Sequence, residues 1–162
     1  MNAVSREEIT ETWAWLCDLD ETATDALVMK FMDEQPALGI YLFANMEEME
    51  EGAEHTRIVE LVVAAWQAMS KVAERQLPAA TPEEIERAED ANTRTLEELD
   101  ETSEFEWENS LRDLFRDYNQ REILGFGIEI LMSGNEETPE LAPEGIGLEM
   151  SWLKTVVDAL DR

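Results

Sequence analysis

The single histidine and the glutamates around it are the first residues whose types suit metal chemistry. His55 lies in the stretch ANMEEMEEGAEHTRIVE, residues 44–60, which contains six glutamates. A helical di-metal site needs two Glu-x-x-His pairs and further glutamates on facing helices. The chain has one histidine, and the residue three positions before it is Gly52, which favours the end of a helix. This stretch therefore predicts a solvated junction between two helices, and we expect no metal site.

The motifs of nucleophilic and cofactor chemistry are missing from the sequence. Cys17 and His55 form the only Cys–His combination. Cys17 shares an apolar helix face with Trp13 and Leu16, which predicts a small buried side chain. There is no Gly-x-Ser-x-Gly elbow and no Gly-Lys-Ser/Thr phosphate loop, and the two Gly-x-Gly pairs do not extend into a dinucleotide-binding motif. We therefore expect no catalytic residue and no cofactor.

Buried glutamates would be the route to an enzyme or a metal-binding bundle. Glu122 and Glu129 lie within the apolar region 111–132, so they are the best candidates for carboxylates that point inward. Acid–base catalysis needs two carboxyl groups in different environments, and among 39 acidic residues the sequence does not identify such a pair. A helical-bundle enzyme or metal-binding protein is therefore the alternative hypothesis.

An acidic strip at residues 97–108 is the most informative charge pattern. It holds seven acids and no Lys or Arg, and a like-charge pair at i, i+4 such as Glu97–Glu101 costs about 0.2–0.5 kcal/mol. The residues before the strip instead form two pairs of opposite charge at this spacing: Glu83–Arg87 and Asp90–Arg94. Four acids of the strip are the predicted partner-binding residues: Glu97, Glu98, Asp100 and Glu101. A merely solvated surface is the competing interpretation.

Capping signals and apolar stripes divide the chain into helices. Three helix starts carry a Ser or Thr cap followed three residues later by Glu: Ser5–Glu8, Thr81–Glu84 and Ser103–Glu106. Pro36 and Pro82 suit the first turn of a helix. The expected helices run over about 5–19, 23–35, 36–52, 54–76, 82–99, 103–132 and 146–160.

The helix at about 54–76 is apolar on nearly every side, which is typical of the central helix of a bundle. The expected helix over 103–132 bends at Gly125 and Gly127, and its last part, 123–132, also fits a short strand. We predict an all-α, single-domain protein over residues 1–162, with six to seven helices around the central helix.

Composition restricts where the protein works and what it binds. A chain of 162 residues with 44% apolar content supports one folded domain despite its net charge of -27. The first residues hold no apolar signal-peptide region, and the longest uncharged run, 35–46, is too short to span a bilayer. A single cysteine fits a reducing compartment, so we expect a cytoplasmic location. Such a negative charge argues against direct binding to nucleic acid or anionic membranes.

These features predict a non-enzymatic interaction protein of bacterial type whose acidic surface binds a basic protein partner. Nucleic-acid mimicry is a sharper version of this hypothesis, in which carboxylates stand where phosphates would. Adaptation to high salt would explain the same acidity without any partner. Trp15 and Trp107 lie off the apolar stripes of their helices and are candidates for a second interface. The sequence leaves a homo-oligomer open.

Overall fold

The computed structural model describes residues 1–47, 54–100, 116–133 and 143–162. Within these residues the protein is all-α, with seven helices and no strand, as the sequence predicts. The helices are α1 (Arg6–Cys17), α2 (Glu21–Glu34), α3 (Pro36–Glu47), α4 (Glu54–Ala73), α5 (Pro82–Asp100), α7 (Arg121–Met132) and α8 (Pro143–Leu160). None of these described helices combines the length and the hydropathy that crossing a membrane requires.

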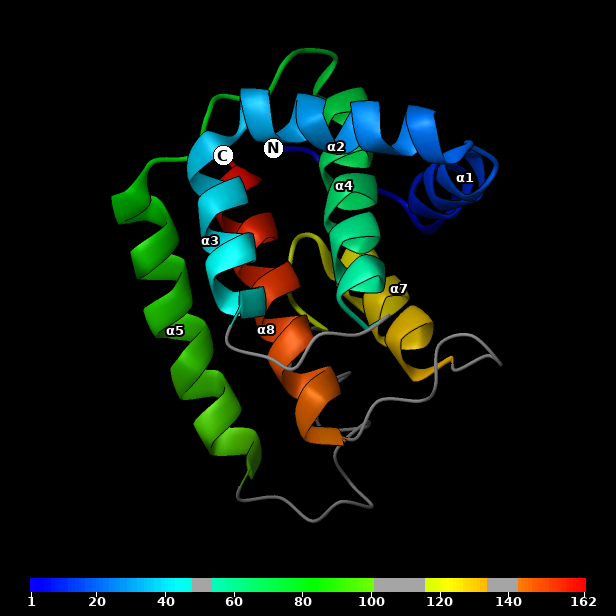
Figure 1. The fold of residues 1–162 in the computed structure, drawn as a ribbon. Coiled ribbons are helices and arrows are strands. Elements are labelled where there is room, and N and C mark those ends of the chain that lie inside the picture. Colours follow the sequence, from blue (N-terminus) through cyan, green and yellow to red (C-terminus); the bar gives the residue numbers. More distant parts are fainter. Residues whose placement is uncertain (48–53, 101–115, 134–142) are drawn as a thin grey trace.

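Two helices, α4 and α8, share the centre of the bundle (Figure 1). α4 packs against α1, α2, α7 and α8 and buries every side chain from Leu61 to Trp66. α8 packs against α4, α5 and α7 and buries Leu153, Val156 and Val157 among others. The predicted central position of α4 is confirmed. α8 shares that position because its apolar residues cover more than one of its faces.

The described helix starts follow the predicted caps. The Ser5 hydroxyl accepts from the N–H of Glu8 at 3.2 Å, and the Glu8 carboxylate accepts from the N–H of Ser5 at 2.7 Å. Thr81 and Glu84 exchange the same two bonds, at 3.3 and 2.8 Å. α2 starts on a cap that the sequence analysis overlooked, since Asp20 accepts from the N–H of Ala23. Local hydrogen bonds of this kind satisfy N–H groups that a helix start would otherwise leave unpaired.

Residues 123–132 are helix and not strand, and α7 is continuous through both glycines. The prediction of one helix running through to Met132 is wrong, because the chain turns at 116–120 and α7 begins at Arg121. Gly127 is required by close packing. A Cβ placed on it would lie 2.5 Å from the side chain of Leu153 on α8, nearer than real contacts allow. The predicted cap at Ser103 lies outside the described residues.

Buried Gln35, between α2 and α3, fixes where α3 begins. Its side-chain N–H group donates to the carbonyl oxygens of Leu77 and Pro78 at 3.3 and 3.2 Å. Its side-chain oxygen accepts from the N–H of Ala80 at 2.9 Å. Both polar ends of the buried amide are thus satisfied, as burial requires. The loop before α5 is therefore held against the start of α3, and the two helices begin side by side (Figure 1).

Candidate functional site

The predicted partner-binding residues fall at the end of α5. Glu97, Glu98 and Asp100 lie in the final turns of this helix, in the part for which only the backbone is described. Glu101 lies outside the described residues. The structure therefore places the strip at the far end of a helix that packs along α8 and touches α3 (Figure 1), and its binding role stays a prediction.

The side of α5 that faces α3 carries acids without cations. Glu89 lies close to Tyr41 of α3: burial first, and then the charge of Glu89, raise the pKa of the Tyr41 hydroxyl to about 12. Glu86, one helical turn before Glu89, is exposed on the same side. Because each residue advances by about 100°, Arg87, Asp90 and Arg94 point away from the side that Glu89 occupies. We call Glu86 and Glu89 the acidic flank.

The predicted pairs of opposite charge on α5 do not form. Neither Glu83–Arg87 nor Asp90–Arg94 is among the ion pairs of the described residues. Exposed charges of this kind gain little from pairing, since water already solvates them. Glu86 and Glu89 of the acidic flank likewise belong to no ion pair of the described residues.

α3 presents an apolar face to solvent. Its inward side chains Leu38 and Leu42 are buried, whereas Ile40 and Phe43 on the other side remain 69% and 39% exposed. Pro36 and Ala44 are exposed as well and complete a row at i, i+4, i+7 and i+8. We call Pro36, Ile40, Phe43 and Ala44 the α3 ridge. The sequence analysis followed only the inward stripe of this helix, and the signal it missed was that the opposite side carries no charge before Glu47.

The other side of α5 closes a small cavity against the end of α8. The cavity has a volume of about 320 Å³, and Arg162 spans it by donating to the Glu84 carboxylate at 2.7 Å. It is lined by Glu84, Arg87, Ala88, Ala91, Asp158, Ala159 and Arg162. Two acidic side chains, two arginines and three alanines line the cavity, so its negative and positive charges are equal in number.

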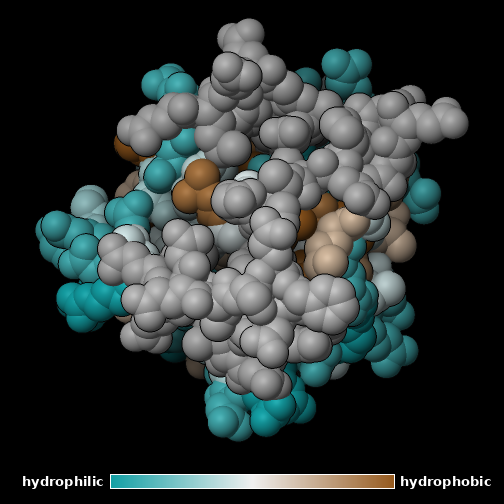
Figure 2. All heavy atoms as spheres, turned by 90° about the horizontal axis from the view of Figure 1, so that it is seen from below, coloured by the Kyte–Doolittle hydropathy of each residue, from teal (hydrophilic) through white to brown (hydrophobic). Residues whose placement is uncertain are grey.

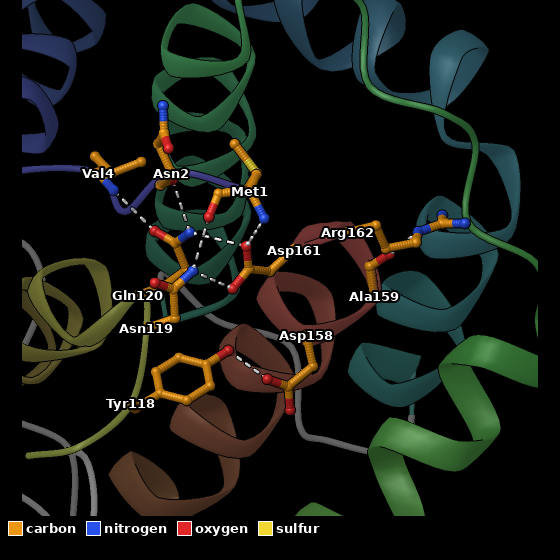
Figure 3. A network of polar contacts seen from close by, with 10 residues as sticks. All are labelled: Met1, Asn2, Val4, Tyr118, Asn119, Gln120, Asp158, Ala159, Asp161 and Arg162. Atoms are coloured by element: carbon orange, nitrogen blue, oxygen red, sulfur yellow. Dashed lines mark hydrogen bonds and ion pairs between the residues drawn. The ribbon is translucent and has the colours of Figure 1, made fainter.

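Asp158 joins three segments beside that cavity. One of its oxygens accepts from the Tyr118 hydroxyl (Figure 3). The other accepts from the Lys154 ammonium at 2.7 Å and from the Asn92 side chain at 3.3 Å. Burial, followed by the charge of Asp158, raises the pKa of the Tyr118 hydroxyl, which therefore stays protonated and keeps donating. Both carboxylate oxygens are occupied, so Asp158 serves to hold α5, α8 and the 116–120 turn together.

Asp161 forms a neighbouring network at the start of the chain (Figure 3). It accepts from the Met1 ammonium at 3.2 Å, from the Asn119 side chain at 2.8 Å and from the Gln120 side chain at 3.0 Å. Fully buried Gln120 also accepts from the N–H of Val4 at 3.0 Å. These bonds tie the first residues to the 116–120 turn and to the end of α8.

The predicted inward carboxylates, Glu122 and Glu129, are at the surface. Glu122 lies 3.4 Å from the Arg121 guanidinium, and Glu129 pairs with Arg6 of α1. The prediction is wrong because α7 turns its apolar residues, not these two, toward α8 and α1. Glu149 of α8 is buried instead, at 1% exposed. Its spacing from Ile146 and Leu153 could have indicated this, since the three residues recur at i, i+3 and i+7.

The candidates for metal and nucleophilic chemistry do not assemble. Among the described residues no group of three His, Cys, Asp or Glu side chains is placed to hold a metal ion. His55 lies in the first turn of α4, where only its backbone is described. Cys17 is exposed, against the prediction, because α1 ends there and Leu16 takes the buried position. Partial burial first, then Glu60 and Asp18, raise the pKa of its thiol, which disfavours the nucleophilic thiolate.

Comparison with family models, with curated proteins and with solved structures found no significant match to this chain. The function is therefore argued from the surface itself.

Proposed function

We propose that this protein is a non-enzymatic interaction protein whose acidic surface binds a basic protein partner. The observation that carries the proposal is the outward placement of its carboxylates. The chain has a net charge of -27, and Glu149 is the only acid counted as buried among the side chains that the structure describes. Seen from below, the described atoms along the left and lower edges of the molecule are largely hydrophilic (Figure 2).

Dispersed surface acids suit binding better than chemistry. Catalysis by carboxylates needs two groups brought together in different environments. The two acids that the sequence favoured for such a role, Glu122 and Glu129, each lie at the surface beside an arginine. Many solvated carboxylates acting together instead produce a long-range field that attracts a positively charged partner and speeds its association.

The predicted strip provides the test. The variant carries Glu97→Gln, Glu98→Gln, Asp100→Asn and Glu101→Gln, and therefore loses four negative charges. The control variant loses four charges on the exposed surface of α1 and α2 and the turn between them, through Glu7→Gln, Glu11→Gln, Asp18→Asn and Asp25→Asn. Both variants should fold, since exposed substitutions usually change stability by less than about 0.5 kcal/mol.

Partner capture from a native lysate should be strong at low salt and should fall steeply at high salt. The screening length shrinks from about 8 Å at 0.15 M to about 3 Å at 1 M. The strip variant should capture less than the control, chiefly through slower association with the captured protein. If the strip variant retains its partners with unchanged association rates, residues 97–101 are a solvated surface. Capture that persists at 1 M salt would contradict an electrostatic partner altogether.

A further inference from the structure

The α3 ridge and the acidic flank lie next to each other on one side of the molecule. α3 and α5 are in contact and run in the same direction (Figure 1). Glu89 lies beside Tyr41. Ala44 and Ile40, about 60° and 100° around α3 from Tyr41, are therefore the part of the α3 ridge nearest the acidic flank, and Phe43 forms its far edge. A surface that is apolar along α3 is thus bordered by negative charge along α5.

The α3 ridge is unusual for a helix of this bundle. α3 is apolar on both its inward and outward sides, and helices of that kind are normally covered all round. Ile40 is the most exposed of the large apolar side chains that the structure describes. Phe43, one turn further along, extends the apolar surface and is 39% exposed. Such a face favours a partner that brings its own apolar residues.

Charge selects the partner. A second copy of this chain would bring another net charge of -27 to the same place, so self-association through this face would be opposed. A positively charged segment would be attracted by the acidic flank, since neither Glu86 nor Glu89 belongs to an ion pair of the described residues. The occupant must therefore be apolar on one side and basic beside it.

We propose that the α3 ridge and the acidic flank together bind a basic amphipathic helix of a partner protein. This inference rests on the proposed function and names the chemistry of its partner. Helices that bind in this way present apolar anchors at i, i+3, i+4 and i+7. From Pro36 to Ala44 the ridge spans about 12 Å along the helix, which matches about two turns of a partner helix. Lys or Arg residues on one side of those anchors would meet the acidic flank.

Two synthetic peptides of identical composition test the proposal. One places leucines at helical spacing with lysines on the opposite side, and the other scrambles the same residues so that no apolar face forms. The wild-type protein should bind the amphipathic peptide more tightly than the scrambled one at the same salt concentration, as measured by calorimetry. The scrambled peptide reports attraction by charge alone.

Two matched pairs of variants locate the binding. Ile40→Gln with Phe43→Gln should weaken binding of the amphipathic peptide at least about tenfold, since apolar anchors carry most of the energy of such an interface. Met29→Gln with Leu148→Gln, which changes two exposed apolar residues on other helices, should not weaken it.

Glu86→Gln with Glu89→Gln should reduce the salt dependence of binding, whereas Glu7→Gln with Glu11→Gln should leave it nearly unchanged. Circular dichroism must show that every variant is folded.

The outcomes separate the inference from the proposed function. Equal binding of the two peptides, unaffected by the Ile40 and Phe43 substitutions, would overturn the role of the α3 ridge and leave a purely electrostatic surface. Failure of both peptides and of lysate proteins to bind would overturn both proposals. If wild-type protein dimerises in sedimentation experiments and the Ile40/Phe43 variant is monomeric, a second copy occupies the ridge and the basic partner is wrong.

Discussion

The two sides of α5 share one backbone but balance their charges differently. On the side facing α3, Glu86 and Glu89 have no cation among the described ion pairs. On the side facing the end of α8, Glu84 pairs with Arg162 at 2.7 Å, and Asp158 pairs with Lys154 at the same distance. The acids on the α8 side are paired with cations of the protein, whereas those on the α3 side remain available to solvent or a partner.

The difference follows from where the few cations lie. Carboxylates held between packed helices lose water and need hydrogen-bond donors or cations, whereas exposed carboxylates keep their hydration. The chain has only 12 Lys and Arg for 39 acids. Two of those cations stand where α5 meets α8, which is where desolvation would otherwise be costly. Glu84 and Glu89 are both half-buried, so the acidic flank differs in belonging to no described ion pair, and its exposed Glu86 is accessible to a partner.

Removing the Asp158 carboxylate, on the α8 side, should change the stability of the protein most. Asp158→Ala should lower the free energy of unfolding by about 2–4 kcal/mol, because the Lys154 ammonium and the Tyr118 hydroxyl lose their shared acceptor. The matched change on the other side, Glu86→Ala, should cost less than about 0.5 kcal/mol. Urea unfolding of the two variants measures both values. Equal losses would show that the two sides of α5 do not differ as described.

Removing the cation that spans the cavity should have a smaller effect. Arg162→Ala takes away a donor to Glu84 and a bond to the Ala159 carbonyl, so the protein should become less stable, by a fraction of the Asp158→Ala loss. The loss should shrink at high salt because both side chains are partly exposed. Arg94→Ala, which removes an exposed arginine outside any described ion pair, is the control and should change stability less. Thermal unfolding at two salt concentrations is the measurement.

The same side of α5 should also respond to acid. The backbone N–H of Thr81, more than Arg162, holds the pKa of Glu84 below its ordinary value of 4.5. A lowered pKa in the folded protein means that this carboxylate stabilises the fold above pH 4.5, and that the contribution is lost as the pH falls through the lower folded value. Glu84→Gln should therefore flatten part of the acid limb of the stability curve. An unchanged limb relative to Glu86→Gln would contradict this role.

Removing charge from the acidic flank should leave stability nearly unchanged. The variant with Glu86→Gln and Glu89→Gln should be as stable as wild type or more stable by up to about 0.5 kcal/mol, because repulsion between these like charges is removed. The inverse variant, with Arg87→Gln and Arg94→Gln, makes the protein more negative and should be slightly less stable. Unfolding at low salt detects both signs. A marked loss in the acidic variant would mean that the flank serves the fold.

The smallest expected effect is the titration of Tyr41 beside the flank. Its pKa of about 12 lies above the ordinary value of 10.0, so the folded protein holds this proton longer and loses stability as the pH rises from about 10 through about 12. Glu89→Gln should lower the pKa of Tyr41 by less than about one unit, since burial is the larger cause. Ultraviolet absorbance follows the phenolate, and Glu83→Gln is the control. If Tyr41 has the same pKa in both variants, Glu89 does not influence its hydroxyl.

Local structure was predictable from sequence because its causes are local. The caps at Ser5 and Thr81 join residues three apart, and the apolar periodicity of residues 54–76 predicts a buried helix wherever that helix packs. Helix propensity and caps made the all-α fold evident, and the net charge of -27 was evident from composition. The predicted strip at 97–101 needs partner measurements, since sequence alone does not distinguish a binding surface from a solvated one.

Which side chains meet was decided by the tertiary structure. The Tyr118 hydroxyl donates to Asp158, 40 positions away in the sequence, and nothing in the local sequence of either residue indicates that hydrogen bond. Glu149 is buried while Glu129 is exposed because burial depends on which neighbour covers each helix face. The same reason leaves Ile40 uncovered: an apolar helix predicts burial, but only the arrangement of its neighbours determines which side they reach.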